Sequence, residues 1–122
     1  MKLRLRQNSL RLRVNRPEVE NLAAGGSLEQ RVQFPDGAAL AYIFESASSA
    51  TASATFRDGV IRVSAPAWQV QDWARGEAIG LYFQLSAGGE ALHVAIEKDL
   101  ECLDAPPEER DANAFRRTGK NC

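Results

Sequence analysis

The first thirteen residues carry five positively charged side chains at alternating positions and no acidic one. Guanidinium and ammonium groups are the usual protein partners of phosphate and carboxylate oxygens. Side chains at alternating positions lie on one face of a β-strand. The pattern therefore indicates an anion-binding surface, offset either by a ligand or by the protein's own acids. The five residues are Lys2, Arg4, Arg6, Arg11 and Arg13.

Apolar residues between these cations predict how the segment folds. A tight turn at Gln7-Asn8 sets Leu5 opposite Leu10 and Leu3 opposite Leu12. In this register a β-hairpin places its apolar side chains on one face and its cations on the other. Like charges then face each other across the two strands, which costs stability unless an anion offsets them. The like-charged pairs are Arg4 with Arg11 and Lys2 with Arg13.

The charge of the whole chain is unevenly distributed. Fifteen Lys and Arg residues against sixteen Asp and Glu residues give a formal net charge of −1. The first sixteen residues hold six of the cations, so the remainder has nine cations against sixteen acids, a formal charge of −7. This asymmetry is typical of a nucleic-acid-binding surface, and equally of a basic hairpin that lies against an acidic part of the same chain.

The length of 122 residues predicts one domain with a modest core. No apolar run is long enough to span a membrane, and the start lacks the apolar stretch of a signal peptide. Two cysteines near the end, Cys102 and Cys122, do not form a disulfide framework. We therefore expect a cytoplasmic protein.

The order of hairpin, short helix and hairpin occurs twice. The first copy spans residues 1–45, the second spans 52–97, and the small residues of 46–50 join them. A shift of 51 positions aligns the apolar residues, the turns and the ends of the helices, as expected of an internal repeat. The aligned pairs include Leu10 with Ile61, Leu12 with Val63, Leu22 with Trp73, and Gly37 with Gly88.

A single ββαββ unit is too small to enclose a core. We therefore expect a β-rich α+β domain over residues 1–98, in which two repeats form an eight-stranded, closed or nearly closed barrel. Residues 99–122 are expected to form an irregular tail packed on this barrel, with Leu100, Leu103 and Phe115 as its anchors.

The turn Asn8-Ser9 and the strand Leu10-Arg11-Leu12 resemble the swapped-hairpin AbrB-like DNA-binding domains, which include the MazE-type antitoxins. Arg4 and Arg13 also fall where those proteins carry cations, whereas Gln7 stands where they carry glycine. Such proteins are normally homodimers whose paired hairpins present basic residues to DNA. The resemblance implies that both halves are fused in this chain. The whole chain also resembles a group of short bacterial proteins of unassigned function.

The second copy departs from this family by losing charge, with Thr55 at the position of Arg4 and Ser64 at that of Arg13. We nevertheless expect a nucleic-acid-binding module, with double-stranded DNA as the partner, and a role such as a transcriptional regulator or an antitoxin-like protein. The alternative is a non-enzymatic protein-interaction module that uses the basic hairpin, the acidic tail or Trp68. The expected nucleic-acid-binding residues are Arg4, Arg6, Asn8, Ser9, Arg11 and Arg13.

Other chemistries find less support in the sequence. His93, Asp99 and the two cysteines match no zinc spacing, so we expect no metal site. A single histidine without a nucleophile motif leads us to expect neither an enzyme nor a bound cofactor. The charges of residues 97–99 are expected at the rim of a strand. No aromatic residue alternates with the arginines, which disfavours a platform for stacking single-stranded bases.

Overall fold

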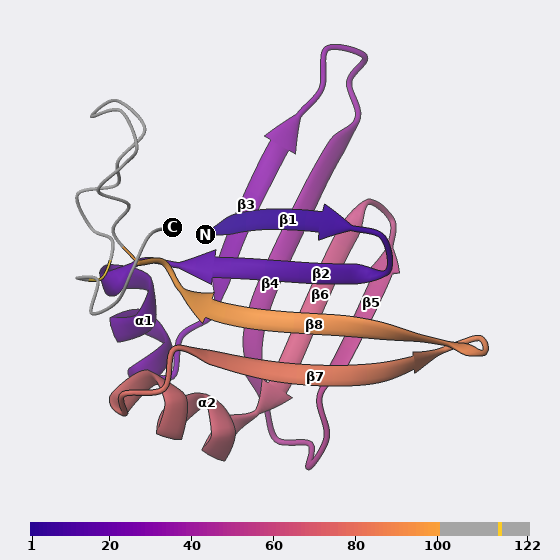
Figure 1. Ribbon diagram of the computed structural model, residues 1–122. Helices are drawn as coiled ribbons and strands as arrows, with labels where there is room; N and C mark the ends of the chain where they lie inside the picture. Colours follow the sequence, from indigo (N-terminus) through magenta and orange to yellow (C-terminus); the bar gives the residue numbers. More distant parts are fainter. Residues whose placement is uncertain (101–114, 116–122) are drawn as a thin grey trace.

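The computed structural model describes residues 1–100 and 115 of the protein. They form two four-stranded sheets and two short helices (Figure 1). The elements in chain order are β1 (Lys2–Arg6), β2 (Ser9–Val14), α1 (Arg16–Ala23), β3 (Leu28–Gln33), β4 (Ala39–Ala47), β5 (Ser53–Arg57), β6 (Val60–Pro66), α2 (Ala67–Arg75), β7 (Gly80–Ala87) and β8 (Glu90–Lys98).

The two sheets share one plan. Sheet A has the order β1-β2-β8-β7, and sheet B has the order β3-β4-β6-β5. Within each sheet two antiparallel hairpins meet through a parallel pair, β2 with β8 in sheet A and β4 with β6 in sheet B. Each sheet therefore takes one hairpin from residues 1–47 and one from residues 53–98.

The β-rich α+β class is confirmed, but the expected barrel is wrong. The described strands form two separate sheets, and β1, β7, β3 and β5 are left as edge strands. The strands of the two sheets cross steeply, as in orthogonal sheet packing (Figure 1). Closure would require edge strands of one sheet to pair with those of the other, whereas the sheets here pack face to face.

The first hairpin has the register predicted from its sequence. Leu3 pairs with Leu12 and Leu5 with Leu10, while Arg4 faces Arg11 across the strands. The turn between them needs a left-handed backbone at Gln7, where φ is 52°. The equivalent turn between β5 and β6 has the same conformation at its first position, Asp58, with φ 51°.

The core lies between the sheets and beneath the helices. Alternating residues of β2, β8, β4 and β6 point inward, and each helix adds its apolar stripe. The helices contact each other at one end of the molecule (Figure 1). The buried set contains equivalent positions of both halves, as the aligned apolar pattern predicts. Its members include Leu10, Leu12, Val14, Val19, Leu22, Phe44, Ile61, Val63, Ala65, Val70, Trp73, Val94 and Ile96.

The helices begin differently although they occupy equivalent places. Asn15 caps α1 in a reciprocal capping box with Glu18, whereas Pro66 precedes α2 without a side-chain cap. The side chain of Gln71 donates to the carbonyl of Leu22 at 2.9 Å and so ties α2 to the end of α1. No described helix has the length and apolar character needed to cross a membrane.

Part of the segment expected as a tail, residues 99–122, lies within the described structure. Leu100 and Phe115 form an isolated β-bridge, and Phe115 packs against the core, so two of the three expected anchors are in contact. Leu103 and both cysteines lie outside the described residues.

Candidate functional site

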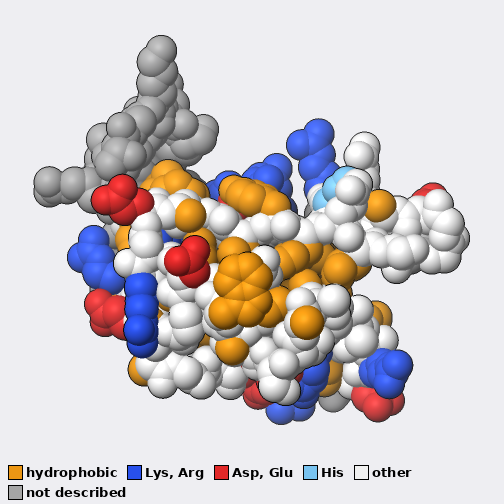
Figure 2. Space-filling model, turned by 90° about the horizontal axis from the view of Figure 1, so that it is seen from below, with side chains coloured by type: hydrophobic (Ala, Val, Ile, Leu, Met, Phe, Trp, Pro, Cys, Tyr) orange, Lys and Arg blue, Asp and Glu red, His pale blue; other side chains and the backbone are white. Residues whose placement is uncertain are grey.

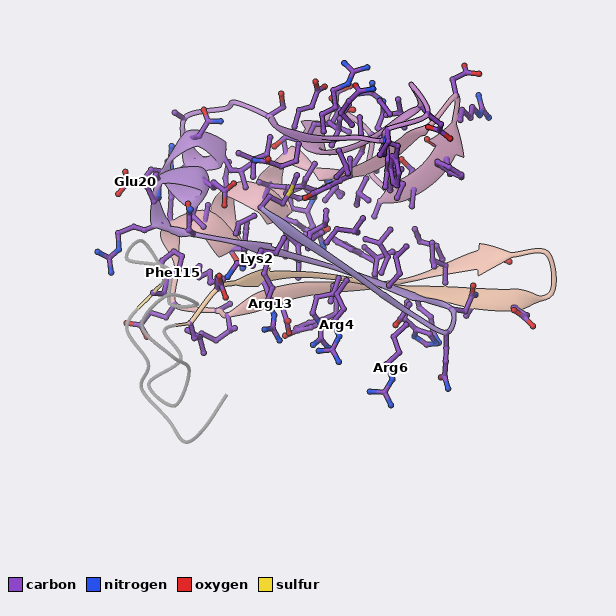
Figure 3. All side chains as sticks on the ribbon, turned by 90° about the horizontal axis from the view of Figure 1, so that it is seen from above. Lys2, Arg4, Arg6, Arg13, Glu20 and Phe115 are labelled. Atoms are coloured by element: carbon purple, nitrogen blue, oxygen red, sulfur yellow. The ribbon has the colours of Figure 1, made fainter. Side chains whose placement is uncertain are left out.

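The cations of the first hairpin lie on the outer face of sheet A. Because Leu3, Leu10 and Leu12 face the core, the residues that alternate with them must face away from it. Figure 3 shows Arg4, Arg6 and Arg13 pointing away from sheet B. Arg4, Arg6 and Arg13 are exposed, and Arg11 is half-buried. Four of the predicted site residues are therefore brought together on one surface.

The other two predicted residues, Asn8 and Ser9, shape the hairpin turn. The side chain of Asn8 donates to the carbonyl of Ala91 at 2.7 Å, which fixes the turn to β8. The hydroxyl of Ser9 donates to the carbonyl of Arg6 at 2.6 Å within the turn. These hydrogen bonds give Asn8 and Ser9 a structural role in the turn.

Two carboxylates offset part of the charge on this face. Glu97 lies between two arginines, with its Oε1 atom 3.1 Å from the Nε atom of Arg11 and 3.8 Å from that of Arg13. The carboxylate of Asp99 lies 2.7 Å from the Nζ atom of Lys2. Both acids come from β8 or the residue after it, so the hairpin's repulsion is relieved by the strand beside it.

The remaining charge is concentrated on β1. Within residues 1–100 and 115, five cations against two carboxylates leave a formal excess of three positive charges on this face. Among the described residues, Arg4 and Arg6 form no ion pair. The described acids therefore offset Lys2, Arg11 and Arg13, and none of them pairs with these two arginines.

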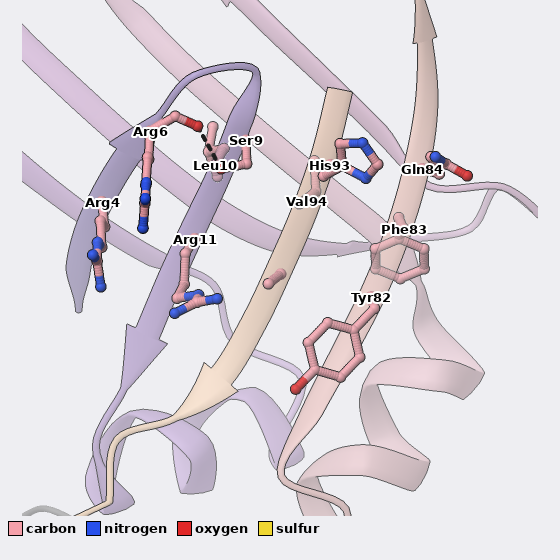
Figure 4. Close-up of a pocket in the computed structure, with 11 residues that line it drawn as sticks. Arg4, Arg6, Ser9, Leu10, Arg11, Tyr82, Phe83, Gln84, His93 and Val94 are labelled. Atoms are coloured by element: carbon pink, nitrogen blue, oxygen red, sulfur yellow. Dashed lines mark hydrogen bonds between the residues drawn. The ribbon is translucent and has the colours of Figure 1, made fainter. Parts of the chain in front are cut away.

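An open groove of about 470 Å³ lies on the same face, and we call it the basic groove. Arg4, Arg6 and Arg11 line one side of it (Figure 4). The other side is formed by side chains of β7 and β8. Ala95 pairs with Arg11 on β2 and with Tyr82 on β7, so this small residue lies between the two sides. The volume of the basic groove falls within the range of small-molecule and cofactor sites. The residues of the second side are Tyr82, Gln84 and His93.

Tyr82 is the exposed aromatic residue of the basic groove, whereas Phe83, which also lines it, packs against the core. The side chain of Tyr82 is 63% exposed, and its hydroxyl donates to the Oε2 atom of Glu97 at 2.8 Å. The pKa of Tyr82 is raised above its ordinary value, first by partial burial and then by the hydrogen bond and negative charge of Glu97, with Arg11 opposing the shift. Glu97 therefore contacts the hydroxyl of Tyr82 and the guanidinium groups of Arg11 and Arg13, and so fixes their relative positions.

Tyr82 could not be assigned to this surface from the sequence. It does not alternate with the arginines along the chain, but β8 brings β7 beside the first hairpin. The alternation of Leu81, Phe83 and Leu85 indicates an outer face for Tyr82. The pairing of β2 with β8 then sets this ring near the arginines, although no aromatic residue alternates with them in the chain.

The outer face of sheet B carries an equivalent ion pair but a smaller excess of charge. Arg62 lies 2.8 Å from Glu45, at the positions that align with Arg11 and Glu97. Thr55 and Ser64 replace the cations found at their counterparts in sheet A, and Ser64 also donates to Glu45. The asymmetry of charge in the sequence is therefore an asymmetry between the two sheets.

The charges at residues 97–99 do not form the exposed rim that we expected. Lys98 and Asp99 are both buried. The ammonium group of Lys98 donates to the carbonyl of Gly76 at 2.9 Å, and its Nζ atom lies 5.8 Å from the ring centre of Trp73. Burial lowers the pKa of Lys98, while the charge of Glu77 opposes the shift. These contacts give Lys98 a structural role at the end of α2.

The residues considered for a metal site are not brought together. His93 is exposed on the basic groove, whereas Asp99 is buried beside Lys2. Within residues 1–100 and 115, no three His, Cys, Asp or Glu side chains form a candidate metal cluster.

Trp68 is the second exposed feature singled out by the sequence. It lies in the first turn of α2 and is 67% exposed, and it borders an open depression with Asp72 and Arg75. Figure 2, which views the molecule from the side of β7 and α2, shows hydrophobic side chains gathered near the centre of this face. Ile79, in the segment between α2 and β7, is a further exposed hydrophobic residue.

Comparison with protein families gives one match, which covers residues 1–118 and is described as a family of unknown function (DUF7009). The chain belongs to this family. The resemblance of the whole chain to a family of unassigned function is thereby confirmed, while no AbrB or MazE family matched. Comparisons with curated proteins and with solved structures gave no match.

Proposed function

We propose that the protein binds nucleic acid through the outer face of sheet A. The observation that carries the proposal is the pair Arg4 and Arg6, which border the basic groove and form no ion pair within the described structure. Cations without an internal partner release counterions from phosphates on binding, and this release supplies most of the affinity for nucleic acid. Arg11 and Arg13 stand beside them, with their guanidinium groups oriented by Glu97.

The exchange of hairpins supports an AbrB-like origin of the fold. Each sheet joins a hairpin of one half to a hairpin of the other, as expected when a swapped-hairpin homodimer becomes one chain. Sheet B lacks the cations that Arg4 and Arg13 supply on sheet A, with Thr55 and Ser64 at these positions, so this proposal uses one binding face per chain. A role in transcription or as an antitoxin-like protein would then depend on this single face.

The test compares charge reversals on the two sheets. Arg4→Glu with Arg6→Glu removes the unpaired cations of the basic groove. Arg31→Glu with Arg57→Glu makes the same change of charge at exposed positions of sheet B and is the matched control. Fluorescence anisotropy with labelled nucleic acid at low salt should show binding by the unmodified protein and the control, and loss of binding by the first variant.

The dependence on salt adds a quantitative check. With up to four arginines contacting phosphates, the slope of log K against log[salt] should reach at most about −3.6 on a duplex and about −2.8 on a single strand. Equal loss of binding in both charge-reversed variants would contradict the proposal, because general charge would then explain the binding. Absence of any binding at about 50 mM salt would contradict it outright.

A protein-binding function is the second candidate, and the exposure of Trp68 favours it. A tryptophan that is 67% exposed is a common anchor of protein interfaces. Trp68→Ala should then abolish the retention of a stoichiometric protein partner while leaving stability within about 0.5 kcal/mol. The other expected contacts were the basic hairpin and the acidic tail, and the tail lies outside the described residues except for Asp99, Leu100 and Phe115.

A further inference from the structure

We propose that the basic groove binds a single-stranded nucleic acid, with phosphates against its arginines and a base against Tyr82. This inference rests on the proposed function and narrows its ligand from nucleic acid in general to an unpaired strand. It differs from the expectation of double-stranded DNA that the sequence alone suggested.

Tyr82 is arranged as a stacking surface. Its hydroxyl is held by Glu97 at 2.8 Å, and the rest of its side chain remains largely exposed. Its cross-strand partner on β8 is Ala95, whose methyl group is too small to cover the ring. Every base has an aromatic face, so a fixed and exposed ring binds bases of any sequence.

The two sides of the basic groove match the two parts of a nucleotide. Arg4, Arg6 and Arg11 present guanidinium groups on one side, while Tyr82 lies on the other (Figure 4). His93 and Gln84 are exposed beside the ring and offer donors and acceptors to the edge of an unpaired base. A cationic side that faces an aromatic, hydrogen-bonding side fits a phosphate and its base together.

A duplex fits the basic groove poorly. Its bases are stacked inside the helix, so a tyrosine on a flat sheet would reach only sugars and phosphates.

The test compares two labelled probes by fluorescence anisotropy. One is an oligo(dT) of about ten nucleotides, within the site sizes of known single-strand binders. The other is a blunt duplex of similar total charge. Tyr82→Leu removes the aromatic ring, whereas Tyr82→Phe keeps the ring and removes only its hydroxyl. Tyr42→Phe is the control for losing a tyrosine hydroxyl at a site outside the basic groove.

We expect the unmodified protein to bind oligo(dT) more tightly than the duplex. Tyr82→Leu should weaken oligo(dT) binding by about 5- to 150-fold, the usual effect of losing one base–aromatic stack. Tyr82→Phe and Tyr42→Phe should bind within about threefold of the unmodified protein. Thermal unfolding of each variant confirms that the comparison is made between folded proteins.

Each failure has a different meaning. Equal or tighter binding of the duplex, or equal weakening by Tyr82→Leu on both probes, would overturn the single-strand inference and leave the proposed function standing. Lack of binding to either probe would overturn both. Competition by thymidine monophosphate at concentrations comparable to the oligonucleotide would also overturn the inference, because the groove would then be a site for a free nucleotide.

Discussion

Replacement of Gln7 by glycine should stabilise the protein. Gln7 is exposed and holds φ at 52°, in the left-handed region. A non-glycine residue there costs about 1–2 kcal/mol. Glycine removes that cost but loses about 0.5–1 kcal/mol through its greater freedom in the unfolded chain. The net gain should therefore be about 0.5–1 kcal/mol.

The equivalent turn in sheet B provides matched controls for Gln7→Gly. Asp58 has φ 51°, but aspartate tolerates this conformation, so Asp58→Gly should change stability little. Gly59→Ala should be destabilising by about 1–2 kcal/mol or more. Gly59 has φ 75°, and an added Cβ atom there would lie 2.8 Å from the carbonyl oxygen of Ala39.

Urea unfolding followed by tryptophan fluorescence measures these differences, since Trp73 is buried in the core. For a domain of this size the gain in Gln7→Gly corresponds to a rise in Tm of roughly 2–5 °C. A loss of stability in Gln7→Gly, or a gain of the same size in Gln7→Ala, would refute the reasoning. Alanine keeps the Cβ atom that makes this conformation costly.

Two further predictions concern the core and the basic groove. Leu12→Ala should lower the free energy of unfolding by about 2–5 kcal/mol, because Leu12 is fully buried. Leu5→Ala, at a position that is 61% exposed, should lower it by less than about 1 kcal/mol. Urea unfolding measures both variants, and similar losses would contradict the assigned core. In a Tyr42→Phe background, ultraviolet titration should place the pKa of Tyr82 above its ordinary value. Stability should accordingly fall as pH rises above about 10, because the raised pKa favours the neutral phenol in the folded state. Glu97→Gln should move that pKa downward without restoring the ordinary value, since burial is the larger cause; an unchanged pKa would contradict the assigned contact.

Local features of the fold were predictable because they depend on near neighbours in the chain. The register of the first hairpin follows from alternation and from a turn at Gln7-Asn8, and the start of α1 follows from Asn15 and Glu18. The aligned apolar positions of the two halves also identified most of the core, including Trp73. In each case the information came from the spacing of apolar residues, which recur every two residues in a strand and every three to four residues in a helix.

The long-range arrangement could not be predicted in the same way. Alternation shows which face of a hairpin is buried but not which other hairpin lies beside it. The choice of two packed sheets over a barrel, and the position of Tyr82 beside Arg11, both depend on the pairing of β2 with β8. For the same reason the partners of Lys2 and Arg11 could be expected as acids without being identified as Asp99 and Glu97.

The parallel pairing of β2 with β8 has a consequence for synthesis of the protein. Sheet B is complete once the chain reaches Pro66, whereas β2 must wait for residues up to Lys98. During translation the basic hairpin therefore emerges before the other strands of the two sheets but acquires its neighbouring strand last. Until then it lacks Glu97, Asp99 and Tyr82, and β2 presents an unpaired edge. A nascent chain that ends near residue 75 would contain the cations but not β7 and β8, so the basic groove would be absent. A ligand that needs both the arginines and the residues of β7 and β8 would therefore bind only after β8 has been synthesised.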